Sequence, residues 1–218
     1  MIGIIALVTL FPFIFILSAS ISDPMEVVSG NVWFLPVGFS LKSYQRIFTT
    51  DTILRAFGNS VFFTAVITFL NVLNSMLAGY ALAKKGLVFR KAIVIYILIP
   101  MYFSGGLIPS FIIISRLGFY NTLWAIILPS ILSIWNIILA RTYISGLPAS
   151  LKEAAIIDGA SEFTVFSRII LPLSKSMIAV LGLYTALAAW NSWFNYMIYI
   201  PKLVEWHPLQ MFLTKVLA

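Results

Sequence analysis

Five long apolar runs constrain the fold of this chain more than any other feature of its sequence. Each run is long enough to cross the hydrocarbon core of a bilayer as a helix, which takes about 20 residues. The runs cover residues 2–20, 59–83, 92–115, 122–144 and 173–200. Lipid cannot hydrogen-bond to exposed peptide groups, so only helices or closed barrels span it, and runs of this length are typical of helices. We therefore predict an all-α fold, a polytopic transmembrane helical bundle that forms one domain over residues 1–218.

Charged residues are scarce, which excludes an ordinary soluble domain. They make up 10% of the chain, against 61% for hydrophobic residues, whereas about a quarter of the residues in a soluble domain are charged. The net charge of +7 could suggest a nucleic-acid partner. The basic residues are scattered at the ends of the apolar runs, however, where they set the topology. We expect membrane lipid around this chain and no nucleic acid.

The chain offers little for metal or redox chemistry. It contains no cysteine, which excludes disulfides and thiolate metal ligands. Its single histidine, His207, precedes Pro208 in a polar segment, and we expect this side chain to be solvated or interfacial. We therefore expect no metal site.

Two local patterns bear on the number of spans. The first run ends in small residues, as a signal peptide does, but no basic residue precedes it, which favours a retained helix. In the third run, Gly105 and Gly106 lie between Pro100 and Pro109. We interpret the two glycines as a flexible break or a close packing point within the span.

The distribution of Lys and Arg predicts the orientation of the bundle. Four basic residues lie between residues 84 and 91, and others flank the next loop on the same side, among them Lys152 and Arg168. Loops dense in basic residues usually face the cytoplasm. We therefore expect a cytoplasmic N-terminus, a cytoplasmic segment at residues 147–172 and, with five spans, an extracellular C-terminus of this chain.

Residues 147–172 are a polar segment between two apolar runs. Ser150 and Glu153 have the S-x-x-E spacing of a capping box, which is typical of a helix start. Gly159 predicts the end of that helix, because glycine tolerates the left-handed geometry of many helix termini. Ser161 is predicted to cap a second short helix. We expect a short helix, a glycine turn and another helix at the membrane surface.

Several strings in the chain resemble one protein family. Glu153-Ala154-Ala155, Gly159 and the Ile-Ile-Leu-Pro string that ends at Pro172 are similar to the EAA loop of bacterial ABC importer permeases. Further segments are similar to the carbohydrate branch of that family, the oligosaccharide importers related to the maltose permease. These segments are residues 103–109 (FSGGLIP), Leu117-Gly118, Trp190-Asn191 and Pro208-Leu209-Gln210. The resemblance extends over nearly the whole chain.

This resemblance implies the ABC type I importer permease fold and a multi-pass protein of the bacterial cell membrane. Members of the branch generally have six spans and end in the cytoplasm. The apolar runs provide five of the expected six. We therefore expect this sequence to be truncated at its C-terminus.

The resemblance also implies the source of energy. The chain has no G-x-x-x-x-G-K-[ST] string, the P-loop that cradles ATP phosphates. We expect that the chain is no enzyme and holds no cofactor, and that ATP is bound by a partner subunit. Residues 147–172 would be a cytoplasmic EAA coupling loop that docks on this partner. The ATPase-coupling residues implied are Ser150, Leu151, Glu153, Ala154, Ala155, Asp158 and Gly159.

The implied assembly gives this chain the role of a membrane-spanning permease subunit that forms the translocation pathway. Its partners would be cytoplasmic ATP-binding-cassette ATPase subunits, a second permease subunit and an extracellular solute-binding protein that delivers a sugar or oligosaccharide. The alternative is a secondary transporter or channel that works without ATP. Ion-coupled transporters place acids within their spans, whereas all seven acids lie outside the apolar runs here. This placement counts against proton coupling.

Polar and aromatic side chains give a candidate substrate pathway. Aromatic faces stack on the C–H surfaces of sugars, and amides hydrogen-bond to hydroxyl groups. An interfacial aromatic belt is the alternative for the aromatic residues. Helix–helix hydrogen bonding is the alternative for the Asn residues of the second run, which share a helix face with Ser75. The candidate residues are Trp190, Asn191, Trp193, Asn195, Asn71 and Asn74.

Overall fold

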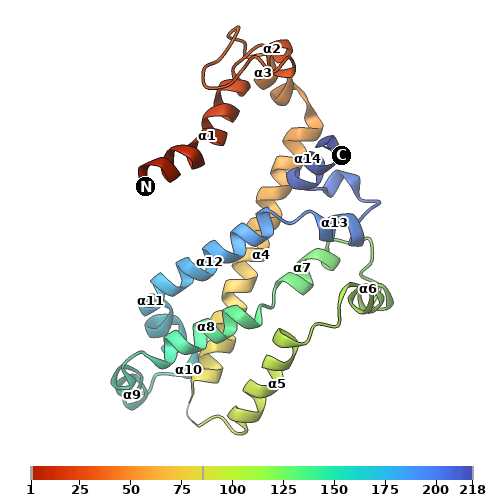
Figure 1. Ribbon diagram of the computed structural model, residues 1–218. Helices are drawn as coiled ribbons and strands as arrows, with labels where there is room; N and C mark the ends of the chain where they lie inside the picture. The colour runs from red at the N-terminus through yellow and green to blue at the C-terminus, as the bar shows by residue number, and fades with distance from the viewer. Residues whose placement is uncertain (1, 85, 218) are drawn as a thin grey trace. The chain divides into compact units, whose positions relative to one another are not determined.

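Helices are the only regular structure in residues 2–84 and 86–217, which the computed structural model describes (Figure 1). The chain forms two compact units, residues 1–56 and 57–218, and the boundary falls within helix α4 (Asp51–Ala83). The prediction of an all-α fold is confirmed. The grouping of the whole chain into one domain stays a prediction.

The first unit is held together by polar contacts in the segment after the first helix. Ser22 donates to the carbonyl of Ser18 (2.6 Å) and accepts from the backbone amide of Val37 (3.1 Å). Asp23 caps the following short helix by accepting from the amide of Met25 (3.0 Å). The helices of this unit are α1 (Ile2–Ser20), α2 (Pro24–Val28) and α3 (Lys42–Thr49).

Helix α4 is longer than the apolar run that predicted it. Its 33 residues extend over about 50 Å at 1.5 Å per residue, more than the roughly 30 Å of a bilayer core. The helix begins at Asp51, eight residues before the apolar run starts at residue 59. The reason is that a helix continues through polar residues that lie outside lipid. The acidic Asp51 in its first turn favours the positive end of the helix dipole.

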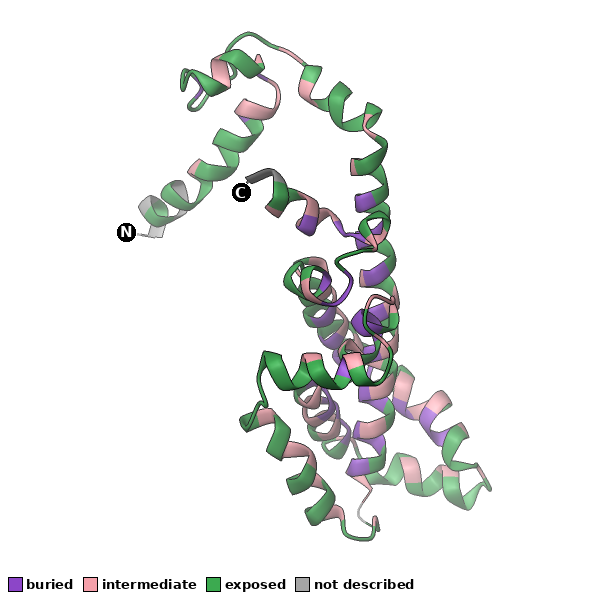
Figure 2. Ribbon diagram, turned by 90° about the vertical axis from the view of Figure 1, so that its right-hand side faces the viewer, coloured by how far each residue is buried: buried purple, intermediate pink, exposed green. Residues whose placement is uncertain are grey.

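The third apolar run forms two helices instead of one. α5 (Arg90–Tyr102) and α6 (Leu107–Arg116) are bent by 113° relative to each other. The break at Gly105 and Gly106 is confirmed. Gly106 has a φ of +84°, a conformation that glycine adopts at little cost. No residue of α5 is buried within the chain (Figure 2).

The remaining helices follow the other apolar runs and the polar segment. The fourth run contains α7 (Trp124–Ser130) and α8 (Ile134–Ser145). The polar segment contains α9 (Ala149–Ile157), α10 (Glu162–Val165), the π-helix η1 (Phe166–Ile170) and α11 (Leu171–Leu173). The last run contains α12 (Lys175–Trp190) and α13 (Phe194–Tyr199), and is followed by η2 (Val204–Trp206) and α14 (Leu209–Leu217).

Two to four candidate membrane spans are found among the described residues. α4 and the α7–α8 stretch, Trp124–Ser145, are long and apolar enough on their own. The number rises to four if each of two bent pairs is one span. These pairs are α5 with α6, and Glu162–Leu173 with α12, which is bent by 78°. The five predicted spans stay a prediction.

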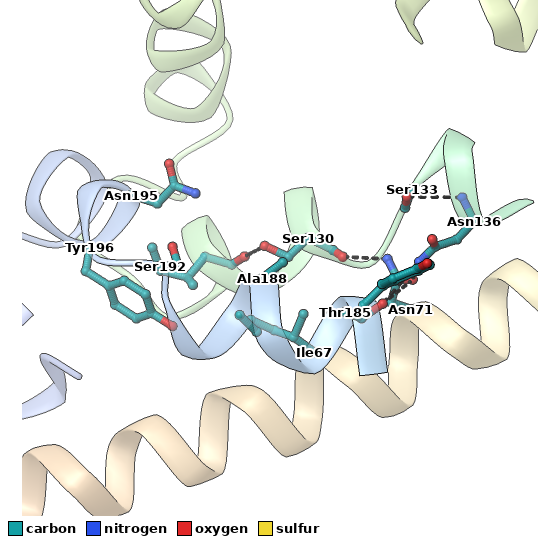
Figure 3. Close-up of a pocket in the computed structure, with 13 residues that line it drawn as sticks. Ile67, Asn71, Ser130, Ser133, Asn136, Thr185, Ala188, Ser192, Asn195 and Tyr196 are labelled. Atoms are coloured by element: carbon teal, nitrogen blue, oxygen red, sulfur yellow. Dashed lines mark hydrogen bonds between the residues drawn. The ribbon is translucent and has the colours of Figure 1, made fainter. Parts of the chain in front are cut away.

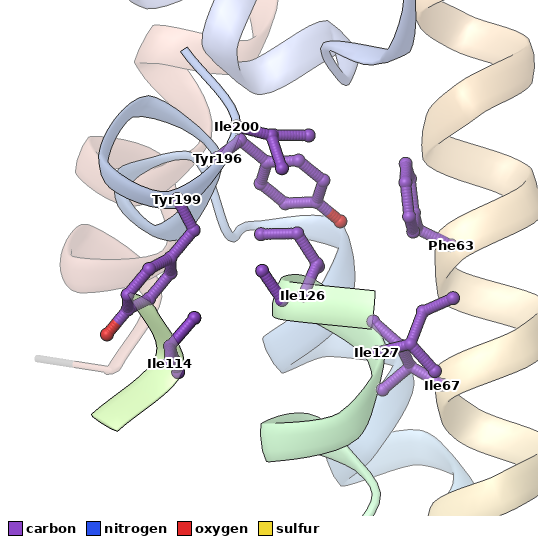
Figure 4. Packing of buried hydrophobic residues seen from close by; sticks show 9 residues of the cluster. Phe63, Ile67, Ile114, Ile126, Ile127, Tyr196, Tyr199 and Ile200 are labelled. Carbon is purple, nitrogen blue, oxygen red and sulfur yellow. The ribbon is translucent and has the colours of Figure 1, made fainter. Parts of the chain in front are cut away.

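One apolar cluster of the second unit joins α4 to α7 and α13 (Figure 4). Phe63 of α4 meets Tyr196 of α13 edge to face, with ring centroids 5.1 Å apart. Both residues are only 1% exposed. Ile126 of α7 and Ile200 belong to the same cluster. Aromatic pairs of this kind add about 0.5–1.5 kcal/mol beyond the area that they bury, so this pair helps to hold α13 on α4.

A second cluster joins α4 and α8 to the α10–η1 segment and α12. The backbones of α4 and α8 approach closely within it. A Cβ placed on Gly79 would lie 2.7 Å from the Cβ of Ala140 and 2.8 Å from the amide nitrogen of Arg141. Small residues permit such contacts, which drive helix association in lipid through van der Waals packing. The buried members are Met76, Tyr80, Ala140, Ile144, Val165, Phe166, Ile170, Met177 and Leu181.

His207 is buried, so the predicted solvated side chain is wrong, and an interfacial position stays a prediction. It is 6% exposed, and burial lowers the pKa of its imidazole, which favours the neutral ring. Its Nδ1 accepts from Nζ of Lys215 (3.3 Å), and its Nε2 donates to the carbonyl of Ile200 (3.1 Å). The amide of Asn59 in α4 donates to the carbonyls of Glu205 and His207. The segment after α13 is therefore folded back onto α4, which removes His207 from water.

Gly79→Ala should destabilise the protein. The added methyl group would overlap with Ala140 and the backbone at Arg141, and overpacking costs about 1–3 kcal/mol. Gly58→Ala is the matched control, because it adds the same group to the same helix with no atom within 4 Å. Thermal unfolding of the detergent-solubilised variants should show a lower midpoint for Gly79→Ala alone. Equal midpoints would contradict the close helix contact.

Candidate functional site

Helix α9 starts two residues earlier than the sequence predicts. It begins at Ala149, with Pro148 in the N-cap position, and no side chain caps it. Ser150 lies inside the first turn, so the predicted capping box of Ser150 and Glu153 is wrong. The φ of Pro148, −57°, is fixed by its ring. Pro148 therefore sets the entry into the helix without a side-chain hydrogen bond.

The end of α9 agrees with the prediction. Gly159 has a φ of +80° and donates to the carbonyl of Ile156 (3.0 Å), while the amide of Ala160 donates to that of Ala155 (2.9 Å). This pair of bonds is the Schellman arrangement that closes helices with a left-handed residue. A Cβ on Gly159 would meet no atom within 4 Å. Backbone conformation, rather than space, therefore calls for glycine here.

Helix α9 exposes apolar side chains that no described part of the chain covers. Leu151 is 44% exposed, Ile156 48% and Ile157 85%. Glu153 is also exposed and forms no salt bridge with any residue in 2–84 or 86–217. Ala155, in contrast, packs against the second apolar cluster. The helix is seated on the bundle by one side and presents another side outward, as an interface would.

The segment after α9 is connected to α4 by Glu162. Ser161 caps α10 as predicted, because its Oγ accepts from the amide of Thr164 (3.2 Å). The carboxylate of Glu162 accepts a hydrogen bond from the hydroxyl of Tyr80 and forms an ion pair with Lys84 (2.9 Å). Tyr80 lies 82 residues before Glu162 in the chain. No local pattern in the sequence could indicate this contact.

A polar pocket lies between α4, α7, α8 and α12, with the start of α13 at one end (Figure 3). Its volume is about 290 Å³. Most of its polar groups are neutral amides and hydroxyls. The lining residues are Ile67, Asn71, Ile126, Ser130, Ser133, Asn136, Tyr184, Thr185, Ala188, Ala189, Ser192, Asn195 and Tyr196.

Buried hydrogen bonds join three helices at one side of the pocket. Asn136 of α8 donates from its Nδ2 to Oδ1 of Asn71 in α4 (2.8 Å) and to Oγ1 of Thr185 in α12 (3.0 Å). Asn71 in turn donates to the carbonyl of Ser130 (2.9 Å). Asn71 is 2% exposed and Asn136 5%. The alternative interpretation of Asn71, helix–helix hydrogen bonding, is confirmed, and the same residue also lines the pocket.

The predicted pathway residues divide into two groups. Asn71 and Asn195 line the pocket, and the other four do not. Asn74 and Asn191 each donate to the carbonyl four residues earlier in their own helices, at 2.8 Å and 2.9 Å. The ring of Trp190 packs on Phe57, with centroids 5.9 Å apart, and that of Trp193 on Phe194, at 5.7 Å.

Sequence reasoning missed several lining residues. Asn136 could have been found, because an amide within an apolar run is costly unless it faces a partner or a cavity. The serines and Thr185 gave no such signal, since hydroxyls bond readily to the preceding turn of their own helix. Thr185 does this too, donating to the carbonyl of Leu181 (2.9 Å). Within residues 2–84 and 86–217, no group of three or more His, Cys, Asp and Glu side chains could hold a metal ion.

Comparisons with known proteins identify the family. The model of the family described as "Binding-protein-dependent transport system inner membrane component" matches residues 62–194. Over 214 residues, the chain is 37% identical to the protein LplC of Bacillus subtilis (strain 168), covering 98% of this chain and 72% of LplC. It is 35% identical over 211 residues to the polygalacturonan/rhamnogalacturonan transport system permease protein YtcP of the same organism, covering 97% and 73%.

A solved structure agrees with this assignment. It is the crystal structure of a bacterial ABC transporter involved in the import of the acidic polysaccharide alginate. One of its chains matches with a TM-score of 0.94 and 32% identity, covering 98% of this chain and 76% of that one. The chain therefore belongs to the family of binding-protein-dependent transport system inner membrane components, and it is a multi-pass permease subunit of an ABC importer, not an enzyme.

Proposed function

We propose that this permease subunit carries a sugar or oligosaccharide across the membrane and is driven by a separate ATPase that docks on α9. The exposed surface of α9 is the observation that carries the proposal. Leu151, Ile156 and Ile157 offer apolar contacts to a partner, and exposed Glu153 offers a carboxylate to a partner's cation. Ala154 allows a close approach, and the family membership of the chain supports an ATPase as the occupant. We therefore propose transport driven by ATP hydrolysis in that subunit rather than the alternative, a transporter that works without ATP.

The other partners follow from the same membership. A binding-protein-dependent importer requires a solute-binding protein, and a second permease subunit completes the pathway. The name of YtcP refers to polygalacturonan and rhamnogalacturonan, and the related structure belongs to a transporter involved in the import of the acidic polysaccharide alginate. Both are chains of sugar units rich in hydroxyl groups. These names support a sugar or oligosaccharide as the cargo of this chain.

The polar pocket is our proposed contact with the substrate. The side chains of Ser192 and Asn195 line it and form no hydrogen bond with the described residues, so they are free to bind hydroxyl groups. The ring of Tyr184 adds an aromatic face. The volume of about 290 Å³ lies at the small end of the range for ligand sites, about 300–1,000 Å³. A site of this size suits one sugar unit at a time.

The proposed topology has a cytoplasmic N-terminus, five of six family spans and an extracellular C-terminus of this chain, within one permease domain over residues 1–218. The contact of Lys84 and Lys152 with the same carboxylate supports this topology. It brings Lys84, the first basic residue after α4, and the α9 segment to the same side of the second unit. Both would then face the cytoplasm, where an ATPase subunit finds ATP.

Gly159→Val should release the ATPase subunit. A β-branched residue at a φ of +80° is strained by about 1–3 kcal/mol, which would change the end of α9. Gly118→Val is the matched control, because Gly118 has a φ of +77° and also has no atom near its Cβ position. Co-purification of the ATPase with the tagged chain should fall several-fold for Gly159→Val alone. Equal recovery with the two variants would contradict the role of the α9 terminus.

Glu153→Lys should weaken coupling without changing the fold. The side chain is exposed and forms no salt bridge with the described residues, so its replacement should alter stability by less than about 0.5 kcal/mol. ATP hydrolysis by the reconstituted importer should nevertheless fall several-fold, and less in Glu153→Gln. Wild-type hydrolysis in Glu153→Lys would argue against this residue as a contact with the ATPase.

Asn195→Leu should affect only substrate uptake, whereas Asn71→Leu should affect both uptake and thermal stability. Loss of the free Asn195 side chain should reduce uptake and leave the unfolding temperature unchanged. Asn71→Leu should lower both, because one Nδ2 hydrogen of buried Asn136 and the carbonyl of Ser130 would lose their partner, at a cost of about 1–3 kcal/mol. Uptake of radiolabelled galacturonan and alginate oligomers into proteoliposomes measures transport. Full uptake by Asn195→Leu would remove this residue from the proposed pathway.

A further inference from the structure

One carboxylate connects three elements at the α9 end of the second unit. Oε2 of Glu162 in α10 receives the hydroxyl of Tyr80 and lies 2.9 Å from Nζ of Lys84, and Oε1 lies 3.9 Å from Nζ of Lys152 in α9. Tyr80 belongs to the last turn of α4, and Lys84 directly follows that helix. α9, α10 and the end of α4 therefore share a single anion. We call these four residues the Glu162 cluster.

The aromatic ring of Tyr80 organises the cations of the cluster. Nζ of Lys84 lies 5.2 Å from its centroid, and Nζ of Lys152 lies 5.4 Å from it. Both distances are within the range of cation–π attraction. Tyr80 itself is 7% exposed and packs on Phe166 of η1, with ring centroids 5.3 Å apart. The ring is held in place by the apolar cluster below it, so the ammonium groups have a fixed support.

Glu162 carries the only negative charge of the Glu162 cluster, so the placement of the two lysine ammonium groups depends on it. Two ammonium groups lie near one carboxylate, so removal of this carboxylate would leave two cations that repel each other. The side chains of Lys84 and Lys152 are 31% and 29% exposed, so water screens this repulsion only in part. Glu162, at 52% exposed, contributes little to the stability of the whole fold. Its effect is on the position of α9 relative to α4.

The main chain connects α9 to some helices of the pocket, whereas only side chains connect it to α4. α9 follows α8 through residues 146–148 and leads through α10, η1 and α11 into α12. The main chain thus connects α9 directly to two helices of the pocket, and α4 is connected to α9 through side chains. Tyr80 lies nine residues after Asn71, a pocket residue, which is about 14 Å along the helix. If the contact between Tyr80 and Glu162 is rigid, a movement of α9 would also move the part of α4 that lines the pocket.

We infer that Glu162 is a positioning residue that couples α9 to α4, so that the two helices move as one body when the ATPase subunits close on ATP. This inference rests on the proposed docking of the ATPase on α9. It adds a specific ionic contact through which α4, which also lines the pocket, follows the motion of α9. Without Glu162, α9 would still bind the ATPase and α4 would lag behind.

The absence of cysteine from the chain permits a direct test by spin labelling. Labels at Ala149→Cys in α9 and Leu77→Cys in α4, both exposed positions, report the distance between the helices. The sample is the complete importer in lipid nanodiscs, with its ATPase subunits, second permease and binding protein, after replacement of any cysteines in those partners. The distance is measured by pulsed electron paramagnetic resonance without nucleotide and after trapping with ATP and vanadate.

The wild type should give the same distance in both states, because α9 and α4 move together. Glu162→Lys should give a distance that changes on trapping, and the exchange variant Lys84→Glu/Glu162→Lys should restore the wild-type result. Glu162→Gln, which keeps the shape and removes the charge, tests the same point if Glu162→Lys does not assemble. Glu205→Gln is the matched control, since it makes the same chemical change outside the Glu162 cluster.

Two results would overturn the inference. One is a distance that changes on trapping in the wild type. The other is a constant distance in both Glu162→Lys and Glu162→Gln, with ATPase subunits bound. A failure of the proposed function is distinguishable from these results, because the ATPase would then be absent from the purified wild-type complex.

Discussion

The close contact between α4 and α8 is the interaction on which the second unit depends. A Cβ at Gly79 would lie 2.7 Å from that of Ala140, so the two backbones are as near as side chains allow. In lipid, helices gain little from burying apolar surface, since the lipid tails are equally apolar, and packing and hydrogen bonds hold them together. The contact at Gly79 brings Asn71 and Asn136 within 2.8 Å. Close packing and the buried amide bond therefore support each other.

The same helix connects the pocket with the α9 surface. Ile67 and Asn71 of α4 line the pocket, whereas Tyr80 reaches the Glu162 cluster. Between them lie Ser75 and Met76, both fully buried. A helix packed this firmly transmits displacement along its axis, because packed interiors deform little. One rigid element can thus serve both a docking surface and a polar pocket without any contact between the two.

Features set by local chemistry could be predicted from the sequence, and features set by distant contacts could not. The glycine terminus at Gly159 and the cap at Ser161 depend on residues a few positions away, and both predictions were right. The break at Gly106 is local for the same reason. The predicted cap at Ser150 failed because the helix begins two residues earlier, with Pro148 in the N-cap position. His207 was misjudged because distant Asn59 draws its segment onto α4.

The pocket shows which residue types carry information in an apolar sequence. Trp190 and Trp193 pack on aromatic neighbours outside the pocket. A large aromatic ring can pack favourably on lipid, on protein or at an interface. A buried amide has fewer options, because each unpaired group costs free energy. The side chains of Asn74 and Asn191 form hydrogen bonds within their own helices, whereas those of Asn71 and Asn136 form a hydrogen bond between two helices. Only amides of the second kind mark where helices converge, and their pairing depends on helix packing that one sequence does not encode locally.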